Sequence, residues 1–213
     1  MDDASPATNL GLLWHPLPWL GFGAVYRQGP TFAFRGEVVQ GPFLESICPG
    51  CFQDKAYRTR YHVPDVYGVG FMAKHPDVPF RASLDVNRVR YSQIMDGFVN
   101  IVAGIAGEPE FEKATPGYSI PDVTEVRLGM EYVVIARSLP IALRLGAWHD
   151  PDHTLRNDGH GVPTEKIRFP GGEDQLHVTF GAGLVAAERF QIDLAVDLAE
   201  SYDAASLSAV FFF

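Results

Sequence analysis

Residues 174–201 show the clearest alternation of apolar and polar positions in the chain. The apolar positions fall into two runs: Leu176, Val178, Phe180, Ala182 and Leu184, then Phe190, Ile192, Leu194, Val196 and Leu198. Period-two alternation places successive side chains on opposite faces of an extended backbone, so each run predicts a β-strand. A short turn near Ala187-Glu188-Arg189 would join the two strands into a hairpin.

The same pattern recurs through the rest of the chain. It predicts strands over residues 10–14, 20–26, 67–73, 80–86, 126–134, 141–147 and 206–213. With the hairpin above, this makes about nine strands and no convincing helix, although residues 98–106 could form a short one. The predicted fold class is therefore all-β, an antiparallel sheet in which consecutive strands are neighbours.

The connections between the predicted strands alternate in length. Short turns fall near residues 17, 76, 138 and 188, long polar segments fall near 41–60, 93–119 and 150–173, and a tight link falls at 202–205. Short turns on one rim and long loops on the other are typical of an up-and-down transmembrane β-barrel. Pro64 and Pro121 each begin a strand after a long segment, in the words V-P-D-V and I-P-D-V, which suggests a repeated hairpin unit.

The polar positions of these strands carry too many charges for a small soluble barrel to bury without cost. A transmembrane barrel turns its apolar side chains to lipid and its polar ones to a wet lumen. The sequence therefore predicts lumen-facing residues, which are also ligand candidates, at Arg81, Asp85, Glu125, Arg127, Glu131, Arg144, Asp193 and Asp197.

Composition agrees with this prediction and removes other classes. A formal charge of -9 gives no electrostatic reason to expect a nucleic-acid partner. No stretch approaches the roughly 18 consecutive apolar residues of a membrane-spanning helix. A mean hydropathy of -0.00 is what alternating strands average to, and 213 residues are enough for one domain.

Several sequence strings resemble the FadL/TodX family of outer-membrane transporters of hydrophobic compounds. They are N-L-G-L-L-W from Asn9, G-A-V-Y-R from Gly23, V-P-D-V-Y-G-V-G from Val63, S-L-D-V-N-R-V-R-Y-S from Ser83, D-Q-L-H-V-T-F-G-A-G-L from Asp174, and S-L-S-A-V-F-F-F at the end. The resemblance implies a barrel of about 14 strands, even-numbered as in bacterial barrels, that is plugged by an N-terminal hatch. Such a barrel moves long-chain fatty acids or aromatic hydrocarbons without ATP.

On this resemblance, residues 1–213 correspond to the C-terminal portion of such a barrel, open or incomplete, without signal peptide, hatch or early strands. The implied function is passive transport of small hydrophobic molecules across the outer membrane of a Gram-negative bacterium, with no enzyme activity and no cofactor. Implied partners are the hydrophobic ligand, outer-membrane lipid and the barrel-assembly machinery, which would recognise Phe211 and Phe213, and the full-length protein would be a monomer. The resemblance implies a basic pocket residue in the I-P-D-V region of fatty-acid members, where this chain has Pro121 and no lysine, so the substrate could be a fatty acid or a hydrocarbon.

Each candidate site has a second interpretation. Arg81, Arg127 and Arg144 could anchor a ligand carboxylate, or could form ion pairs with Asp85, Glu125 and Glu131 that hold the wall together. The aromatic residues near strand ends could form interfacial girdles or pack as in any sheet: Trp14, Trp19, Tyr26, Trp148 and Phe190.

The loop histidines His149, His153 and His160 could bind a divalent cation, but their spacing matches no short motif and a solvated loop is the better interpretation. Cys48 and Cys51 lie in another long loop, where an oxidising exterior favours a disulfide over free thiols.

Two other functions compete with transport. One is a structural or adhesive outer-membrane barrel without transport activity. The other is a barrel-borne hydrolase, which would need a serine and a histidine within hydrogen-bond reach on the lipid-facing surface. His177 is predicted to lie on the lumen side, which argues against the hydrolase.

Overall fold

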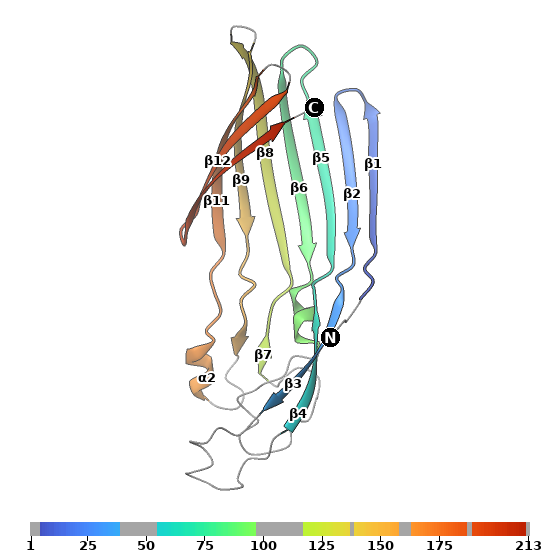
Figure 1. Ribbon diagram of the computed structural model, residues 1–213, viewed down its shortest axis with the longest axis vertical. Coiled ribbons are helices and arrows are strands. Elements are labelled where there is room, and N and C mark those ends of the chain that lie inside the picture. The colour runs from blue at the N-terminus through green and yellow to red at the C-terminus, as the bar shows by residue number, and fades with distance from the viewer. Residues whose placement is uncertain are drawn as a thin grey trace.

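The computed structural model describes residues 5–38, 55–96, 117–136, 139–157, 163–186 and 189–211. Within these ranges the chain is almost entirely β-structure (Figure 1). The short helical elements among the described residues are the 3-10 helix η1 (Tyr91–Met95) and the helix α2 (Pro163–Arg168). No helix in these parts of the chain is long and apolar enough to span a membrane.

Nine of the described strands form one antiparallel sheet in which neighbours in the sheet also follow one another along the chain. They are β1 (Asn9–Leu17), β2 (Leu20–Arg27), β5 (Val66–Lys74), β6 (Phe80–Val89), β8 (Val123–Ala136), β9 (Leu139–Asp150), β11 (Gln175–Ala186), β12 (Phe190–Leu198) and β13 (Asp203–Phe211). Each contains one of the runs of alternating residues, so the predicted all-β fold and its meander order are confirmed.

The hydrogen-bond register aligns the alternation of each strand with that of its neighbour. Phe22 of β2 lies opposite Phe71 of β5, which lies opposite Leu84 of β6. Leu84 in turn lies opposite Leu128 of β8. Because a one-residue slip would move every side chain of a strand to the other face, this register gives the sheet two chemically distinct faces.

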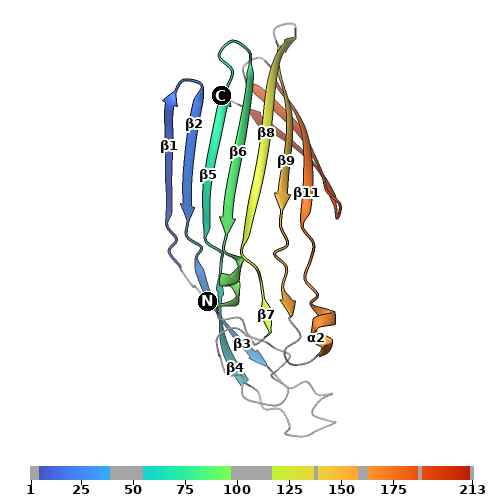
Figure 2. The same ribbon diagram turned by 180° about the vertical axis from the view of Figure 1, so that it is seen from behind.

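The two rims of the sheet differ as predicted (Figures 1 and 2). The turns between β1 and β2, β5 and β6, β8 and β9, and β11 and β12 all lie at one end, which we call the short-turn rim. The longer connections join strand ends at the opposite end of the sheet, which we call the long-loop rim. There the chain leaves β2 and returns at β5, and it leaves β9 and returns at β11. The predicted 41–60 and 150–173 segments belong to these two connections.

Part of the predicted 41–60 loop is in fact strand. Strands β3 (Thr31–Val38) and β4 (Lys55–His62) form a hairpin of their own. Alternation did not predict this hairpin, because the K-A-Y-R-T-R-Y-H segment of β4 is rich in basic residues and its two tyrosines stand four positions apart. The long-loop rim also holds the short pair β7 (Tyr118–Ser119) and β10 (Arg156–Asn157), where loop alone was predicted.

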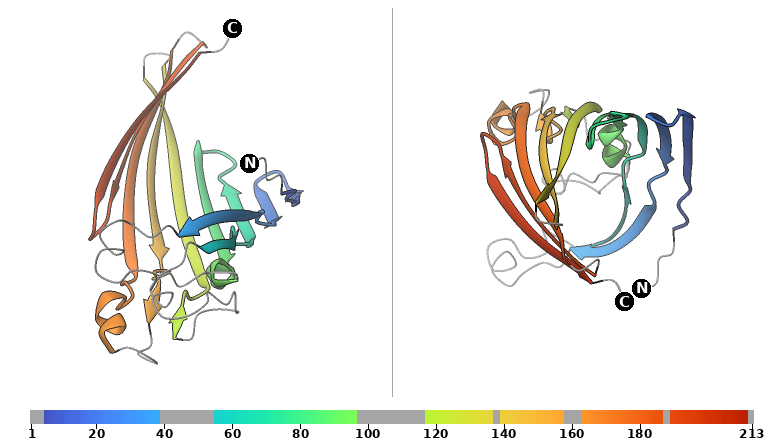
Figure 3. Two further views of the ribbon diagram at one scale, coloured as in Figure 1. Left: turned by 60° about the horizontal axis from the view of Figure 1, so that its bottom comes forward. Right: turned by 90° about the horizontal axis from the view of Figure 1, so that it is seen from above.

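The sheet is strongly curved but not closed (Figure 3). Strands β1 and β13 are its two edges, and among the described residues neither pairs with a further strand on its outer side. This confirms the expectation of a barrel that is open or incomplete. The expected link at 202–205 lies slightly earlier, since β13 already begins at Asp203.

The sheet has almost no buried apolar core of its own. The buried apolar side chains of the described residues are Val89, Met95, Ile120 and Val123, which belong to η1 and to strand ends at the long-loop rim. The wall above this cluster is one sheet thick and exposes both faces. The surroundings of each face must therefore match the polarity of the side chains on that face.

Several predictions fall on residues outside the described ranges. They concern the short helix at 98–106, the cysteines Cys48 and Cys51, the histidine His160 and the terminal Phe213. Each of these remains a prediction.

Candidate ligand groove on the inner face of the sheet

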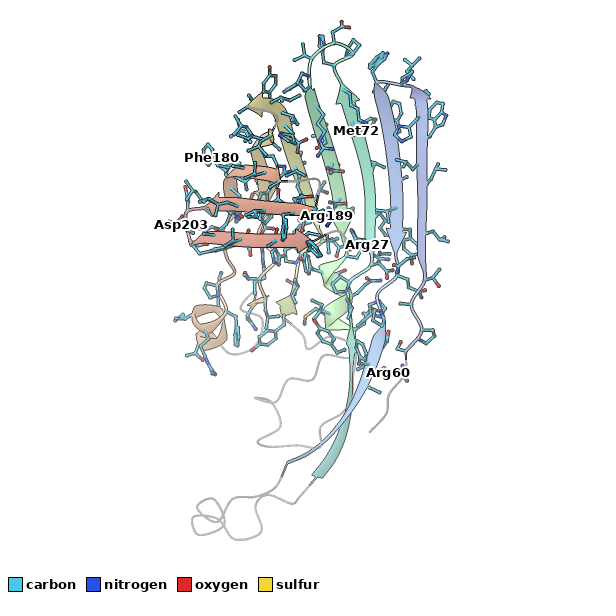
Figure 4. The ribbon with its side chains drawn as sticks, turned by 45° about the horizontal axis from the view of Figure 1, so that its top comes forward. Arg27, Arg60, Met72, Phe180, Arg189 and Asp203 are labelled. Carbon is cyan, nitrogen blue, oxygen red and sulfur yellow. The ribbon has the colours of Figure 1, made fainter. Side chains whose placement is uncertain are left out.

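The two faces of the sheet carry different side chains. Five apolar residues chosen from the alternation are 47–61% exposed on one face, as expected for side chains that face outward: Leu143, Leu176, Phe180, Ile192 and Leu194. The eight predicted lumen residues all lie on the opposite, inner face, since the register places Asp85 opposite Arg127 and Glu131 opposite Arg144. Side chains project from both faces of the wall (Figure 4).

The inner face is itself divided into two parts. Strands β1, β2 and β5 form a smooth part, whose inward positions between the strand ends are apolar or glycine except for His15, which lies over Gly21. The apolar and glycine positions are Gly11, Leu13, Gly21, Gly23, Val25, Gly68, Gly70 and Met72. Strands β6, β8, β9, β11 and β12 form a charged part, which carries all eight candidate residues. The boundary between the two parts runs between β5 and β6.

A groove of about 610 Å³ lies across this boundary. Its smooth side includes Leu13, Gly21, Gly23, Gly70 and Met72, and its charged side includes Ser83, Asp85, Arg127, Glu131, Arg144 and Trp148. A smaller groove of about 320 Å³ continues over the smooth part and shares Leu13, Gly23, Gly70 and Asp85 with it. The inner face therefore offers an elongated depression that is apolar on one side and ionic on the other.

Glycines leave the base of the groove without side chains at two positions of β5. A Cβ at Gly70 would lie 2.6 Å from Asp85 Oδ1, and a Cβ at Gly68 would lie 2.5 Å from Asn87 Oδ1. Because no side chain stands at these two positions, Asp85 and Asn87 can lie flat over the neighbouring strand. Polar side chains thus line the wall without filling the space above it.

The arginines of the charged part are engaged in ion pairs. Arg81 donates to Glu131 at 3.0 Å, and Arg144 donates to the same carboxylate at 2.7 Å. Arg144 also donates to Asp193, which accepts a further hydrogen bond from Gln191 at 2.7 Å. This network joins β6, β8, β9 and β12, as the ion-pair interpretation expected.

Arg127 makes a separate pair. It donates to Glu125 at 2.8 Å, and its guanidinium carbon lies 5.1 Å from the centre of the Trp148 ring. The predicted partner Asp85 lies directly across from Arg127 in the sheet, but the guanidinium turns to Glu125 instead. The Asp85 carboxylate makes no hydrogen bond or ion pair with any residue in the described part of the chain.

Trp148 does not belong to an aromatic girdle. It points inward, lines the groove and stacks on His177 with ring centres 3.9 Å apart. His177 is 1% exposed, and its Nδ1 lies 3.0 Å from Asp197 Oδ1. The girdle prediction is wrong for this residue, whereas Trp14 and Trp19 are exposed near the short-turn rim and fit it.

The repeated sequence motifs V-P-D-V and I-P-D-V have a structural explanation at the long-loop rim. Asp65 accepts hydrogen bonds from the Gly29 N–H at 2.8 Å and from the Gln93 side chain at 3.1 Å. Asp122 accepts one from the Ser92 N–H at 2.9 Å. Both aspartates therefore hold η1 against the strands that follow each proline, a role that sequence reasoning missed although it singled out the repeat.

These hydrogen bonds shift the titration of the rim carboxylates. Burial alone would raise the pKa of Asp65, but the hydrogen bonds from Gly29 and Gln93 outweigh it and hold that pKa below its usual range. The pKa of Asp122 is lowered in the same way by Ser92, against the effect of burial. Both groups are thus carboxylates at neutral pH.

The loop histidines do not form a metal centre in the described residues. His149 lies 3.5 Å from Asp174 and His153 lies 3.5 Å from Asp150, as two separate pairs. No group of three or more potential ligands occurs within the described ranges. His153 instead stacks on Tyr91 with ring centres 4.4 Å apart.

A comparison with solved structures finds a protein of similar fold. The chain is similar to a crystal structure of a Pseudomonas aeruginosa FadL homologue, with a TM-score of 0.62 and 14% sequence identity. The similarity covers 97% of this chain and 49% of that chain, so this chain spans about half the length of that structure. The fold is therefore FadL-like, a barrel-type antiparallel sheet that is not closed here.

Sequence comparisons add no relative. No family model matches the sequence, and a search of curated proteins finds no match.

Proposed function

We propose that this chain forms part of the wall of a transmembrane β-barrel in the outer membrane of a Gram-negative bacterium, through which small hydrophobic molecules pass. The observation that carries the proposal is the two-faced sheet. Its outer face exposes rows of large apolar side chains, and its inner face carries ion pairs and an elongated groove. An apolar outer face suits lipid, and a polar inner face suits a wet lumen. The FadL-like fold supports the proposal.

The open edges support a larger barrel to which this chain contributes the C-terminal portion. Lipid cannot satisfy unpaired backbone groups, each at a cost of about several kcal/mol, so a stable barrel needs further strands between β1 and β13. Nine consecutive antiparallel strands make β1 and β13 run in the same direction. An odd number of added strands would therefore close the barrel with antiparallel pairs on both sides and with an even total.

In this proposal, the protein is a passive conduit and not an enzyme. Outer-membrane lipid covers the outer face, and the barrel-assembly machinery recognises the residues Phe211 and Phe213. The complete barrel is a monomer, and membership of the FadL/TodX family is part of the proposal.

An uptake assay with a matched pair of substitutions tests transport. Ser83 lies on the groove, and its neighbour Leu84 points to the other face. Cells that express the gene should take up a neutral hydrophobic fluorophore faster than cells without it. Ser83→Trp, which fills the groove, should lower that uptake several-fold, whereas Leu84→Trp should leave it unchanged at equal surface amounts of protein.

The alternative is a structural or adhesive barrel without transport. It predicts that expression of the gene and both substitutions leave uptake unchanged. Uptake that does not depend on the gene would overturn the transport proposal and leave the membrane location standing.

A further inference from the structure

We propose that the groove selects apolar molecules that carry a protonated amine, and that Asp85 binds this amine. The inference rests on the proposed function and names the substrate class of the same groove. It follows from how the charges of the inner face are distributed among partners, from where Asp85 lies, and from what surrounds it.

The arginines that line the groove have carboxylate partners already. Glu131 accepts hydrogen bonds from Arg81 at 3.0 Å and from Arg144 at 2.7 Å. Asp193 takes the other end of the Arg144 guanidinium, and Glu125 takes Arg127. A ligand carboxylate would add a negative charge beside Glu125, Glu131 and Asp193, which already neutralise these arginines, so the groove offers little to an anionic head group.

Asp85 is the exception among the ionic side chains on the floor of the groove. It has no hydrogen-bond or ion-pair partner in the described residues, and its Oδ1 lies over Gly70, flat against the wall. Its carboxylate is thus open toward the groove and held next to apolar surface. A carboxylate in this setting attracts a cation that can donate hydrogen bonds.

The position of Asp85 also defines where the apolar part of a ligand would lie. It is shared by the two grooves and is the charged residue among those that line the smaller one. Apart from Asn87 of β6, the other residues there belong to β1, β2 and β5 and include Leu13 and Val25, with Gly23 and Gly68 at the base. An amine bound at Asp85 would leave its apolar substituent along this glycine floor.

Trp148 provides a reporter inside the groove. The full-length barrel, with every tryptophan except Trp148 replaced by phenylalanine, Trp14 and Trp19 among them, would be reconstituted in phosphatidylcholine nanodiscs at neutral pH. Three ligands of matched shape would be titrated, each with a bromine that quenches tryptophan: p-bromobenzylamine, p-bromobenzyl alcohol and p-bromobenzoate. We expect binding of the amine to be about five- to tenfold tighter than that of the alcohol, from one charge-assisted hydrogen bond, with the carboxylate weakest.

Substitutions assign the preference to Asp85. Asp85→Asn should remove the advantage of the amine and leave the alcohol within about twofold of its original affinity. Asp85→Glu, which keeps the charge, should retain the preference. Asp77→Asn is the matched control, because it removes the same charge from the exposed turn between β5 and β6, away from the groove.

The outcomes separate this inference from the proposed function. Equal binding of the three ligands, tighter binding of the carboxylate, or an amine preference that survives Asp85→Asn would overturn the inference while the groove remains a site for hydrophobic molecules. If even the neutral alcohol failed to quench Trp148 in nanodiscs that hold folded β-sheet by circular dichroism, the groove itself, and with it the proposed function, would be wrong.

Discussion

The outer and inner faces of the wall follow different rules although they are built from the same strands. On β12, Leu194 is 50% exposed on the outer face, and its neighbours Asp193 and Ala195 point inward. Between the two rims, the outer face consists of apolar side chains such as Leu143 and Phe180, whereas polar outward pairs such as Arg88 with Thr124 lie near the long-loop rim. The inner face contains ion pairs, such as that of Arg144 with Glu131, in which each side chain compensates the charge of the other.

Adjacent residues of one strand should therefore respond to substitution in two different ways. A residue of the outer face should tolerate any substitution that stays apolar, since only the match to lipid matters. A residue of the inner face should be sensitive to the loss of its partner and to the space above its neighbours. The predictions below test this contrast from the largest expected effect to the smallest.

The largest effect is expected from a charge on the outer face. Leu194→Arg should lower the free energy of unfolding in phospholipid vesicles by about 2–4 kcal/mol, because an arginine near the bilayer midplane loses its hydration. Ala195→Arg should cost far less, since its inward neighbours include Asp193 and Asp197. Urea titration followed by tryptophan fluorescence measures both. Equal losses would show that the two faces meet the same solvent.

The ion-pair network of the inner face should give the next effect. Arg144→Met removes the donor to Glu131 and should destabilise the protein by roughly 1–2 kcal/mol, since the carboxylate loses a charge-assisted hydrogen bond. Arg81→Met removes the more exposed partner of the same carboxylate and should cost less than about 1 kcal/mol. The same urea titration compares them, and a larger effect of Arg81→Met would contradict the network described above.

The glycines of the inner face should differ according to the space above them. A Cβ at Gly146 would lie 2.5 Å from Thr179 Oγ1 and 3.1 Å from the Leu128 carbonyl oxygen, so Gly146→Ala should cost about 1 kcal/mol. A Cβ at Gly129 would meet only the Ser83 hydroxyl, at 3.2 Å. Gly129→Ala should therefore be close to neutral, because the gain in strand propensity offsets a small adjustment. If both variants unfolded at the same urea concentration, close packing would not explain Gly146.

The smallest effect on stability is expected at the long-loop rim, where carboxylates such as Asp65 accept hydrogen bonds from backbone N–H groups. Asp65→Asn should lower stability by about 0.5–1 kcal/mol at neutral pH, because the charged acceptor of Gly29 is lost. Since the pKa of Asp65 is lowered in the folded state, its contribution is fully present above the ordinary value of about 3.9 and is lost as pH falls through the folded-state pKa. Unfolding curves of the wild type and of Asp65→Asn should therefore converge below about pH 4. A difference that persisted unchanged in acid would show that Asp65 acts through shape alone.

Alternation in the sequence was sufficient to predict the nine strands of the sheet, their order and the faces of its apolar runs and of the eight charged candidates, although not the inward position of Trp148. The reason is that the face to which a strand side chain points is a local property, set by the two-residue period of an extended chain. Phe180 and Asp193 could therefore be assigned to opposite faces before any strand partner was known. The hairpin of β3 and β4 was not predicted, because β4 is rich in basic residues and lacks the alternating apolar positions of the nine strands.

The pairing of charges on the inner face could not be predicted in the same way. An inward residue has several inward neighbours, opposite and diagonal, and the choice among them depends on side-chain rotamers and on space above the adjacent strand. Thus Arg127 lies across from Asp85 but binds Glu125 and packs on Trp148. The absence of a side chain at Gly70 lets Asp85 lie flat and unpaired beside the groove, and that arrangement arises from contacts between strands rather than from the order of residues within one.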